Sequence, residues 1–130
     1  MKYFGNFTDR ESVAREFSRN KYNDAFTIPD NFPTDEEMLL ASYETPGYDG
    51  MAFVLFQQGG QLYEVHGSHC SCYGLEDQWN PEATTWEALA MRPRPTTISG
   101  YGYIHDYYGM SDAMVTTLWA LIDAHVSPPR

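Results

Sequence analysis

The sequence predicts an α+β fold in which an antiparallel sheet of three to five strands is packed by an N-terminal and a C-terminal helix. Three strand-like runs follow one another within residues 38–66 and are separated by turn signals, which is typical of a meander. Apolar residues recur at helical spacing near both ends of the chain. The 130 residues fit one domain, 1–130, with enough chain to bury a hydrophobic core.

The first helix is expected over Asp9–Arg19. Thr8 and Glu11 have the spacing of a capping box, in which the hydroxyl accepts a backbone N–H and the carboxylate reaches back. The apolar positions of this helix are Val13, Ala14 and Phe17. Residues 20–36 are rich in Asn, Asp and Pro, so an irregular connection is expected there.

The three strands of the meander are expected over Met38–Glu44, Met51–Gln57 and Gln61–His66. The second run is almost continuously apolar, which favours a central strand. Gly59 and Gly60 separate it from the third run, in which apolar and polar residues alternate. A Gly-Gly pair between two such runs indicates a hairpin.

Two more helices and one more strand are expected in the second half of the chain. The capping-box spacing of Thr84 and Glu87 predicts a short helix over residues 85–91, which the following prolines end. A strand over residues 96–104 is expected, with its place in the sheet left open. The last helix is expected over residues 111–125, with an apolar stripe of Val115, Leu118, Trp119 and Ile122.

The acidic residues are concentrated in the middle of the chain. The net charge is −10, and no Lys or Arg lies between Lys21 and Arg92. Twelve Asp and Glu residues lie in that gap, so it carries −12, whereas residues 1–21 carry +2 and residues 92–130 carry 0. Nucleic-acid binding needs Lys and Arg on the phosphates and is therefore disfavoured. A basic protein partner matches the gap, and simple solubility is the alternative explanation.

The candidate partner-binding residues are taken from this acidic gap. They are Asp35, Glu36, Glu37, Glu44, Asp49, Glu76 and Asp77. The chain has no apolar run of the ~20 residues that a membrane helix needs and no signal-peptide pattern at its N-terminus. We therefore expect a cytoplasmic protein without membrane contact, whose cysteines are reduced. The oligomeric state is left open.

Residues 66–72 are the densest source of chemically active side chains, with two His, two Cys and two Ser in the segment HGSHCSC. The segment is expected to leave the third strand and enter a loop, with a tight bend at Gly67–Ser68. A zinc site would use His69, Cys70, Cys72 and His105. The C-x-C spacing argues against this, since structural zinc sites usually pair ligands two to four residues apart, so the favoured assignment is no cofactor.

Three other interpretations of this segment stay open. A catalytic cysteine would need a base such as His69 or His105, but acidic surroundings raise a thiol pKa. A structural role, with His69 hydrogen-bonded inside, is the favoured interpretation. The last interpretation is contact with a ligand without a metal. Its candidate residues are His69, Cys70, Cys72, Tyr101, Tyr103 and His105.

The stretch from Leu62 to Leu89 carries a resemblance to known sequences. Its core is GSHCSCYGLE, followed by Gln78-Trp79, Pro81-Glu82 and Thr85-Trp86-Glu87-Ala88-Leu89. This pattern resembles a stretch of short, uncharacterised bacteriophage and prophage proteins over roughly residues 38–91. The resemblance implies no established activity. It does imply a phage context, in which small acidic proteins often blunt host defences, as anti-CRISPR proteins do.

Three function hypotheses follow, and the third is a purely structural virion or assembly component, for which a large exposed apolar patch is expected. The leading one is a phage-derived, non-enzymatic accessory protein that acts in the host cytoplasm and inhibits a host defence protein by occupying its basic, nucleic-acid-binding surface. The alternative is a small-ligand or nucleotide-binding protein, or an enzyme, that uses the 66–72 segment with or without zinc.

Overall fold

The computed structural model describes residues 2–19, 25–44, 50–69, 74–92 and 111–126. They form a five-stranded sheet in the order β1-β2-β3-β4-β5. The strands are β1 (Tyr3–Gly5), β2 (Met38–Glu44), β3 (Gly50–Gln58), β4 (Gln61–His69) and β5 (Glu82–Thr84). The helices are α1 (Arg10–Ser18), α2 (Trp86–Ala90) and α3 (Asp112–His125). The predicted α+β class is confirmed. The strand expected over 96–104 lies outside the described residues.

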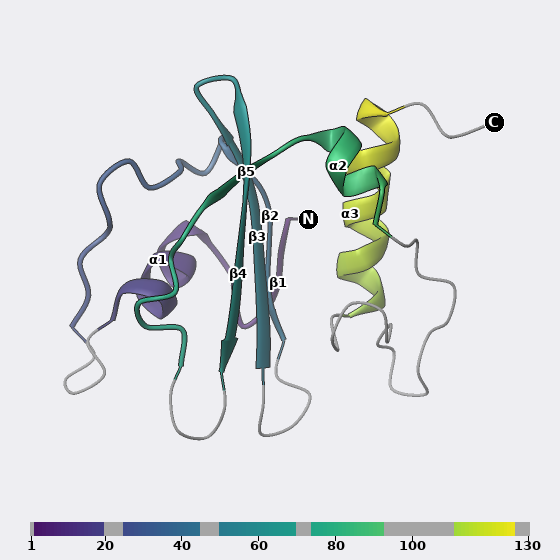
Figure 1. Cartoon of the computed structure of the whole chain (residues 1–130). Coiled ribbons are helices and arrows are strands. Elements are labelled where there is room, and N and C mark those ends of the chain that lie inside the picture. Colours follow the sequence, from purple (N-terminus) through teal and green to yellow (C-terminus); the bar gives the residue numbers. More distant parts are fainter. Residues whose placement is uncertain (1, 20–24, 45–49, 70–73, 93–110, 127–130) are drawn as a thin grey trace.

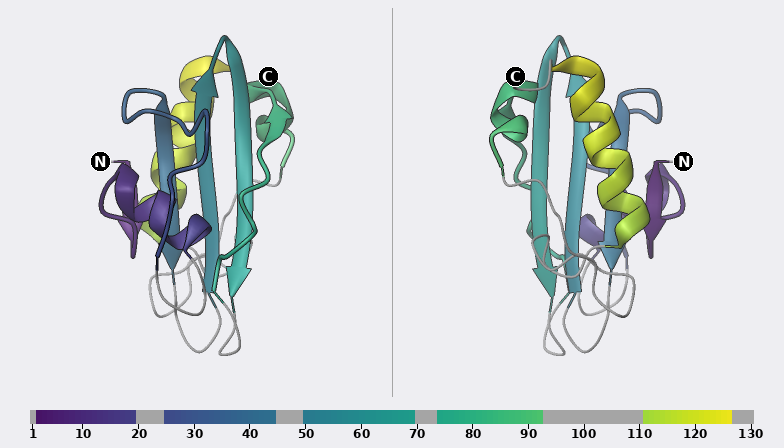
Figure 2. Two further views of the ribbon diagram at one scale, coloured as in Figure 1. Left: turned by 90° about the vertical axis from the view of Figure 1, so that its left-hand side faces the viewer. Right: turned by 90° about the vertical axis from the view of Figure 1, so that its right-hand side faces the viewer.

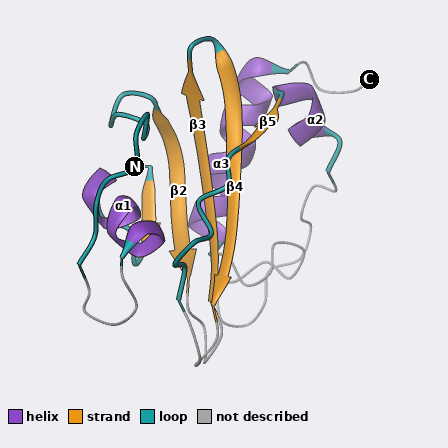
Figure 3. Cartoon of the chain, turned by 60° about the vertical axis from the view of Figure 1, so that its left-hand side comes forward, coloured by secondary structure: helices purple, strands orange, loops and turns teal. Residues whose placement is uncertain are grey.

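The centre of the sheet is the predicted meander. β2 pairs with β3 and β3 with β4, both antiparallel, so that Ser42, Phe53 and His66 lie side by side in one row across the sheet. Figure 3 shows the three long strands running next to one another. Because successive side chains of a strand point to opposite faces, each central strand supplies apolar groups to both faces. This is why β3 is apolar from Met51 to Phe56.

Helices cover the sheet on both faces. Figure 1 shows the sheet nearly edge-on, with α1 on one side and α2 and α3 on the other, and Figure 2 shows α3 running along the strands. The core under α1 includes Phe7, Val13, Phe17, Ala52, Val54, Val65 and Leu75. The core under α3 includes Phe53, Leu55, Leu62, Leu89, Val115, Leu118 and Ile122. The predicted stripe of the last helix is thus buried against the sheet. No described helix has the length and apolar character needed to cross a membrane.

The two edge strands were not expected from the sequence. β1 pairs parallel with β2, so the sheet is mixed, and β5 pairs antiparallel with Leu62–Glu64 of β4. Each edge strand has three residues, too few for a periodic pattern. At the end of β1, Gly5 has φ 66°, and an added Cβ would lie 2.2 Å from the carbonyl oxygen of Tyr43. Only glycine fits this position.

Two of the predicted helix caps are shifted by one residue. The N-cap of α1 is Asp9, which forms a capping box with Ser12, instead of Thr8 with Glu11. The N-cap of α2 is Thr85 instead of Thr84. In both pairs two good capping residues are adjacent, and the chain uses the second. Ser111 caps α3, because its Oγ accepts the N–H of Met114 at 3.3 Å.

The cap of α2 gives a first prediction. Thr85 Oγ1 accepts the N–H of Ala88 at 3.0 Å, and α2 is only five residues long. Thr85→Ala should lower the free energy of unfolding by about 1 kcal/mol, whereas Thr85→Ser should stay close to the wild type. Urea unfolding measures both variants. Equal stabilities of the Ala and Ser variants would show that this cap contributes nothing.

Candidate functional site

The structure places the first four residues of the 66–72 segment inside the sheet. His66, Gly67, Ser68 and His69 belong to β4 and pair with Phe53, Ala52, Met51 and Gly50 of β3. The predicted end of the strand at His66 and the bend at Gly67–Ser68 are therefore wrong. The strand continues because Gly67 is a packing position: an added Cβ would lie 3.0 Å from Leu75 Cδ2 and 3.2 Å from Phe17 Cε1.

The two histidines of this segment do not converge. His66 lies against Phe53, in the core under α3, with 5.1 Å between ring centroids. His69 lies against Tyr43, in the core under α1. A ligand set that uses both imidazoles is therefore not built. Within the described ranges, no group of three or more His, Cys, Asp and Glu side chains could hold a metal ion. Cys70, Cys72, Tyr101, Tyr103 and His105 lie outside these ranges.

His69 is held by a phenol. Tyr43 Oη and His69 Nδ1 are 2.8 Å apart, and the two rings meet edge-on at 86°. Burial, with a smaller contribution from Glu16, raises the pKa of Tyr43 to about 12, so the hydroxyl keeps its proton. It can donate that proton to Nδ1 of a neutral imidazole. The contact fits the structural role expected for His69, because it ties the end of β4 to β2.

The strongest polar cluster of the described residues surrounds Glu64, which the sequence did not single out. Its side chain is 6% exposed on the α3 face of the sheet. One carboxylate oxygen lies 2.5 Å from His66 Nε2 and 2.6 Å from Arg92 Nη2. His66 and Arg92 are 51% and 39% exposed. A buried carboxylate thus fixes the direction of two solvent-facing groups.

These contacts keep Glu64 ionised. Burial raises its pKa, but hydrogen bonds from His66, Arg92 and Thr84 outweigh burial and lower the pKa to about 2. A carboxylate only accepts hydrogen bonds, so His66 donates from Nε2. Nδ1 of a neutral His66 is then an acceptor. Alternation along β4 was the available signal, since Glu64 and His66 are two residues apart and share a face.

The pKa of Glu64 predicts how stability depends on pH. The value is about 2 in the folded chain against an ordinary 4.5, so the folded state binds fewer protons between these limits. The contribution of Glu64 to the free energy of unfolding is complete above about pH 4.5 and is lost as the pH falls toward 2. We expect it to be on the order of 2 kcal/mol, because both partners are partly exposed.

Guanidinium unfolding of the wild type and Glu64→Gln, from neutral pH down to about pH 2, measures this contribution. The difference in free energy of unfolding between the two proteins should shrink below pH 4.5, where the wild-type carboxyl begins to lose its advantage over the amide. A difference that stays constant over this range would contradict the assignment.

The acidic gap is partly neutralised in three dimensions. Each of three ion pairs joins a basic residue from outside the gap to an acid inside it. They are Lys2–Asp35 at 3.7 Å, Arg19–Glu76 at 3.0 Å and Arg92–Glu64 at 2.6 Å. Glu76 is only 11% exposed, and it also accepts the N–H of Gly74. Its carboxylate serves internal contacts instead of a partner surface.

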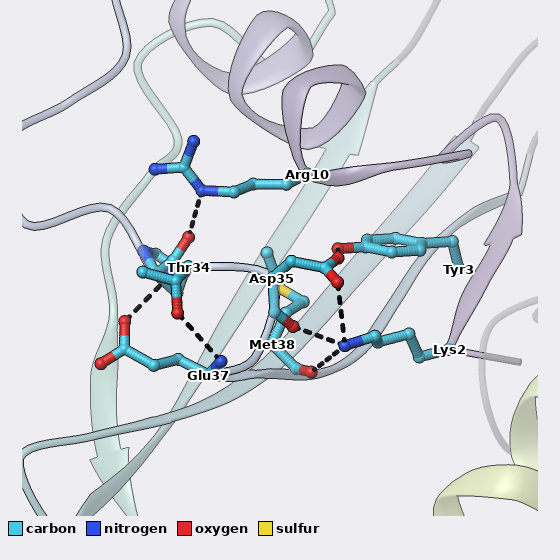
Figure 4. Close-up of polar contacts among 8 residues, drawn as sticks. Lys2, Tyr3, Arg10, Thr34, Asp35, Glu37 and Met38 are labelled. Atoms are coloured by element: carbon cyan, nitrogen blue, oxygen red, sulfur yellow. Dashed lines mark hydrogen bonds and ion pairs between the residues drawn. The ribbon is translucent and has the colours of Figure 1, made fainter.

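The acidic run before β2 is also used internally (Figure 4). Asp35 accepts the hydroxyl of Tyr3 at 2.6 Å, and this hydrogen bond, together with Lys2, lowers the pKa of Asp35. Glu37 accepts the N–H of Thr34 at 2.9 Å, which lowers its pKa. Arg10 donates to the carbonyl of Pro33 at 2.6 Å. The run therefore holds the start of β2 to β1 and α1.

The remaining partner-binding candidates differ in exposure. Glu36 and Asp77 are exposed, Glu44 is half-buried and Asp49 lies outside the described residues. Three exposed acids of the gap that the sequence did not single out are Asp30, Glu82 on β5 and Glu87 in the first turn of α2.

Basic side chains are used by internal contacts. Five Lys and Arg residues lie in the described ranges. Three form the ion pairs above, Arg10 binds a carbonyl and lies over the ring of Phe32, and Arg15 lies over the ring of Phe26. The described surface therefore offers acids more than bases.

Comparisons with known proteins found no matching family model, no matching curated protein and no matching solved structure.

Proposed function

We propose that the protein is a non-enzymatic acidic binder that inhibits a host protein by occupying its basic surface in the host cytoplasm. The observation that supports this most is the unequal use of charge. The basic side chains of the described ranges are held by internal contacts, while Glu36, Asp77, Glu82 and Glu87 remain exposed. Such a surface attracts positively charged partners over several ångströms and repels nucleic acid.

Two of these exposed acids lie on successive elements, whereas Glu36 and Asp77 lie apart in separate connections. Glu36 lies in the connection into which Lys2 and Arg10 donate. Asp77 follows Glu76, which pairs with Arg19. Glu82 and Glu87 lie on the successive elements β5 and α2, where the nearest described base in sequence, Arg92, is held by Glu64. We name Glu82 and Glu87 the acidic edge and assign the partner contact to it.

The partner that fits this edge is a protein whose Lys and Arg side chains normally hold nucleic acid. Carboxylates can occupy positions meant for phosphates, and the complementary charge speeds association. The phage resemblance of residues 38–91 favours a partner in a host defence system.

The proposal is tested by capturing proteins from a host lysate on the wild type and on two variants, each of which removes two negative charges. Glu82→Gln/Glu87→Gln removes two charges from the acidic edge. Glu11→Gln/Glu16→Gln removes two from α1, where Arg10 and Arg15 are close in sequence. At about 0.7 kcal/mol per exposed contact, the edge variant should bind the captured protein about tenfold more weakly. Equal binding by both variants, or no protein retained at low salt, would refute the proposal.

The alternative function, a small-ligand or nucleotide-binding protein or an enzyme with or without zinc, has one observation in its favour. Buried Glu64 orients half-exposed His66, and such carboxylate–imidazole pairs occur in proton-transfer and metal sites. A thermal-shift screen against nucleotides and divalent metals tests it. A bound ligand at a hundredfold excess over Kd stabilises the fold by about 2.7 kcal/mol, and the stabilisation should vanish in His66→Gln.

A further inference from the structure

Among the described residues, β5 is the strand beside the outer edge of β4, and it covers only part of that edge. β5 pairs with Leu62–Glu64 and with no residue further along β4. In the part of the chain that the structure describes, no strand lies beside the rest of β4, up to His69. An uncovered strand edge presents N–H and C=O groups that can pair with another chain.

A single side chain makes the missing strand contacts. The amide oxygen of Gln78 accepts the N–H of Ser68 at 2.9 Å, and its Nε2 donates to the C=O of Ser68 at 2.8 Å. This is the reciprocal pair of hydrogen bonds that a residue of a neighbouring antiparallel strand would make. Because outward-facing groups alternate along a strand, His66 presents its N–H and C=O to the same side.

The turn before Gln78 is built to hold that carboxamide. Nε2 of Gln78 also donates to the C=O of Gly74 at 2.8 Å. The backbone N–H of Gln78 donates to the C=O of Leu75 at 3.1 Å. Asp77 has φ 62°, a conformation that costs energy in a residue other than glycine. Arg19 pairs with Glu76 and fixes the turn to the end of α1. Buried Leu75 anchors it in the core.

We infer that Gln78 is an edge block, which occupies the Ser68 main-chain groups that a second copy of this chain would otherwise pair with. Without the carboxamide, the His66–Ser68 edges of two copies can meet antiparallel. Both residues are exposed. The inference is independent of the acidic edge, because it concerns main-chain groups of β4 and not the carboxylates of β5 and α2.

The test compares Gln78→Ala with Gln58→Ala. Gln58 is a matched control, because its carboxamide also makes two contacts, with Asn31 and Glu37, away from this edge. In Gln78→Ala the Ser68 amide should exchange at least about tenfold faster at low concentration. The sedimentation coefficient of Gln78→Ala should rise with protein concentration. Neither change should occur in Gln58→Ala.

Two further variants keep the inference falsifiable. Ser68→Pro in the Gln78→Ala background removes the N–H and should abolish the association. Gln78→Glu keeps an acceptor for Ser68 and adds a charge at the edge, so it should not associate. A Ser68 amide that stays protected in Gln78→Ala, or a Gln78→Ala chain that sediments as the parent does, would overturn the inference. Association of Gln78→Glu would overturn it as well.

Discussion

Replacing Glu64 with alanine is expected to lower the free energy of unfolding by about 3 kcal/mol at neutral pH. The change removes two charge-assisted hydrogen bonds, from His66 at 2.5 Å and from Arg92 at 2.6 Å, and leaves space in the core under α3. The cost stays moderate because both partners are partly exposed and can be hydrated. Chemical denaturation of the two proteins measures the effect.

The matched control for this change is Glu82→Ala. Glu82 lies opposite Glu64 on β5 but is exposed, so its removal should change stability by less than about 0.5 kcal/mol. A double-mutant cycle with Arg92→Ala separates the ion pair from the packing loss. If Glu64→Ala and Glu82→Ala have the same stability, the hydrogen bonds of Glu64 with His66 and Arg92 do not stabilise the fold.

Replacing Gly67 with valine is expected to cost about 2–3 kcal/mol. An added Cβ already lies 3.0 Å from Leu75 and 3.2 Å from Phe17, and the two methyl groups of valine need still more room. Phe17 and Leu75 are almost fully buried, so neither can move aside freely. Thermal unfolding of the variant measures the loss.

Ser68→Val is the control for the Gly67 change. It adds the same β-branched side chain at the next residue of β4, where the side chain is exposed. Valine favours strands, so Ser68→Val should keep the stability of the parent. An equal loss of stability in both variants would mean that valine is not tolerated at this end of β4. The packing of Phe17 and Leu75 over Gly67 would then not be the cause.

The sequence predicted the regular elements well where their patterns are long. The strands of the meander have seven or nine residues and are bounded by turn signals, and the last helix has an apolar stripe at helical spacing. β1 and β5 have three residues each and are stabilised by pairing with β2 and β4, so they carry no signal of their own. The caps at Asp9 and Thr85 show that two adjacent capping residues are not distinguished by local chemistry.

The end of β4 was misjudged for a different reason. Gly67 and Ser68 are residue types of turns, but the alternation of faces continues through them to His69. Gly67 is small because Phe17 and Leu75 pack over it, and such tertiary packing is invisible in a local pattern. The density of His and Cys in 66–72 therefore suggested one site, whereas His66 and His69 lie on opposite faces of the sheet.

The order of charged residues along the sequence is a poor guide to the charge on the surface of the fold. The gap between Lys21 and Arg92 suggested one continuous acidic region. In the fold, Lys2, Arg19 and Arg92 cross into that region and pair with Asp35, Glu76 and Glu64. Long-range pairs of this kind depend on the topology of the sheet, which brings β1, α1 and the end of α2 close to the meander. The pairing leaves Asp30, Glu36, Asp77, Glu82 and Glu87 exposed, and the acidic edge is the part of this set on β5 and α2.

The most direct test of the proposed function is a competition between this protein and nucleic acid for the captured partner. Fluorescence anisotropy of a labelled nucleic acid bound to that partner follows the release. The wild type and Glu11→Gln/Glu16→Gln should displace the nucleic acid, and Glu82→Gln/Glu87→Gln should need about tenfold more protein. Displacement should weaken as salt is added. Nucleic acid that stays bound at saturating wild-type protein, or equal displacement by the two variants, would contradict the proposal.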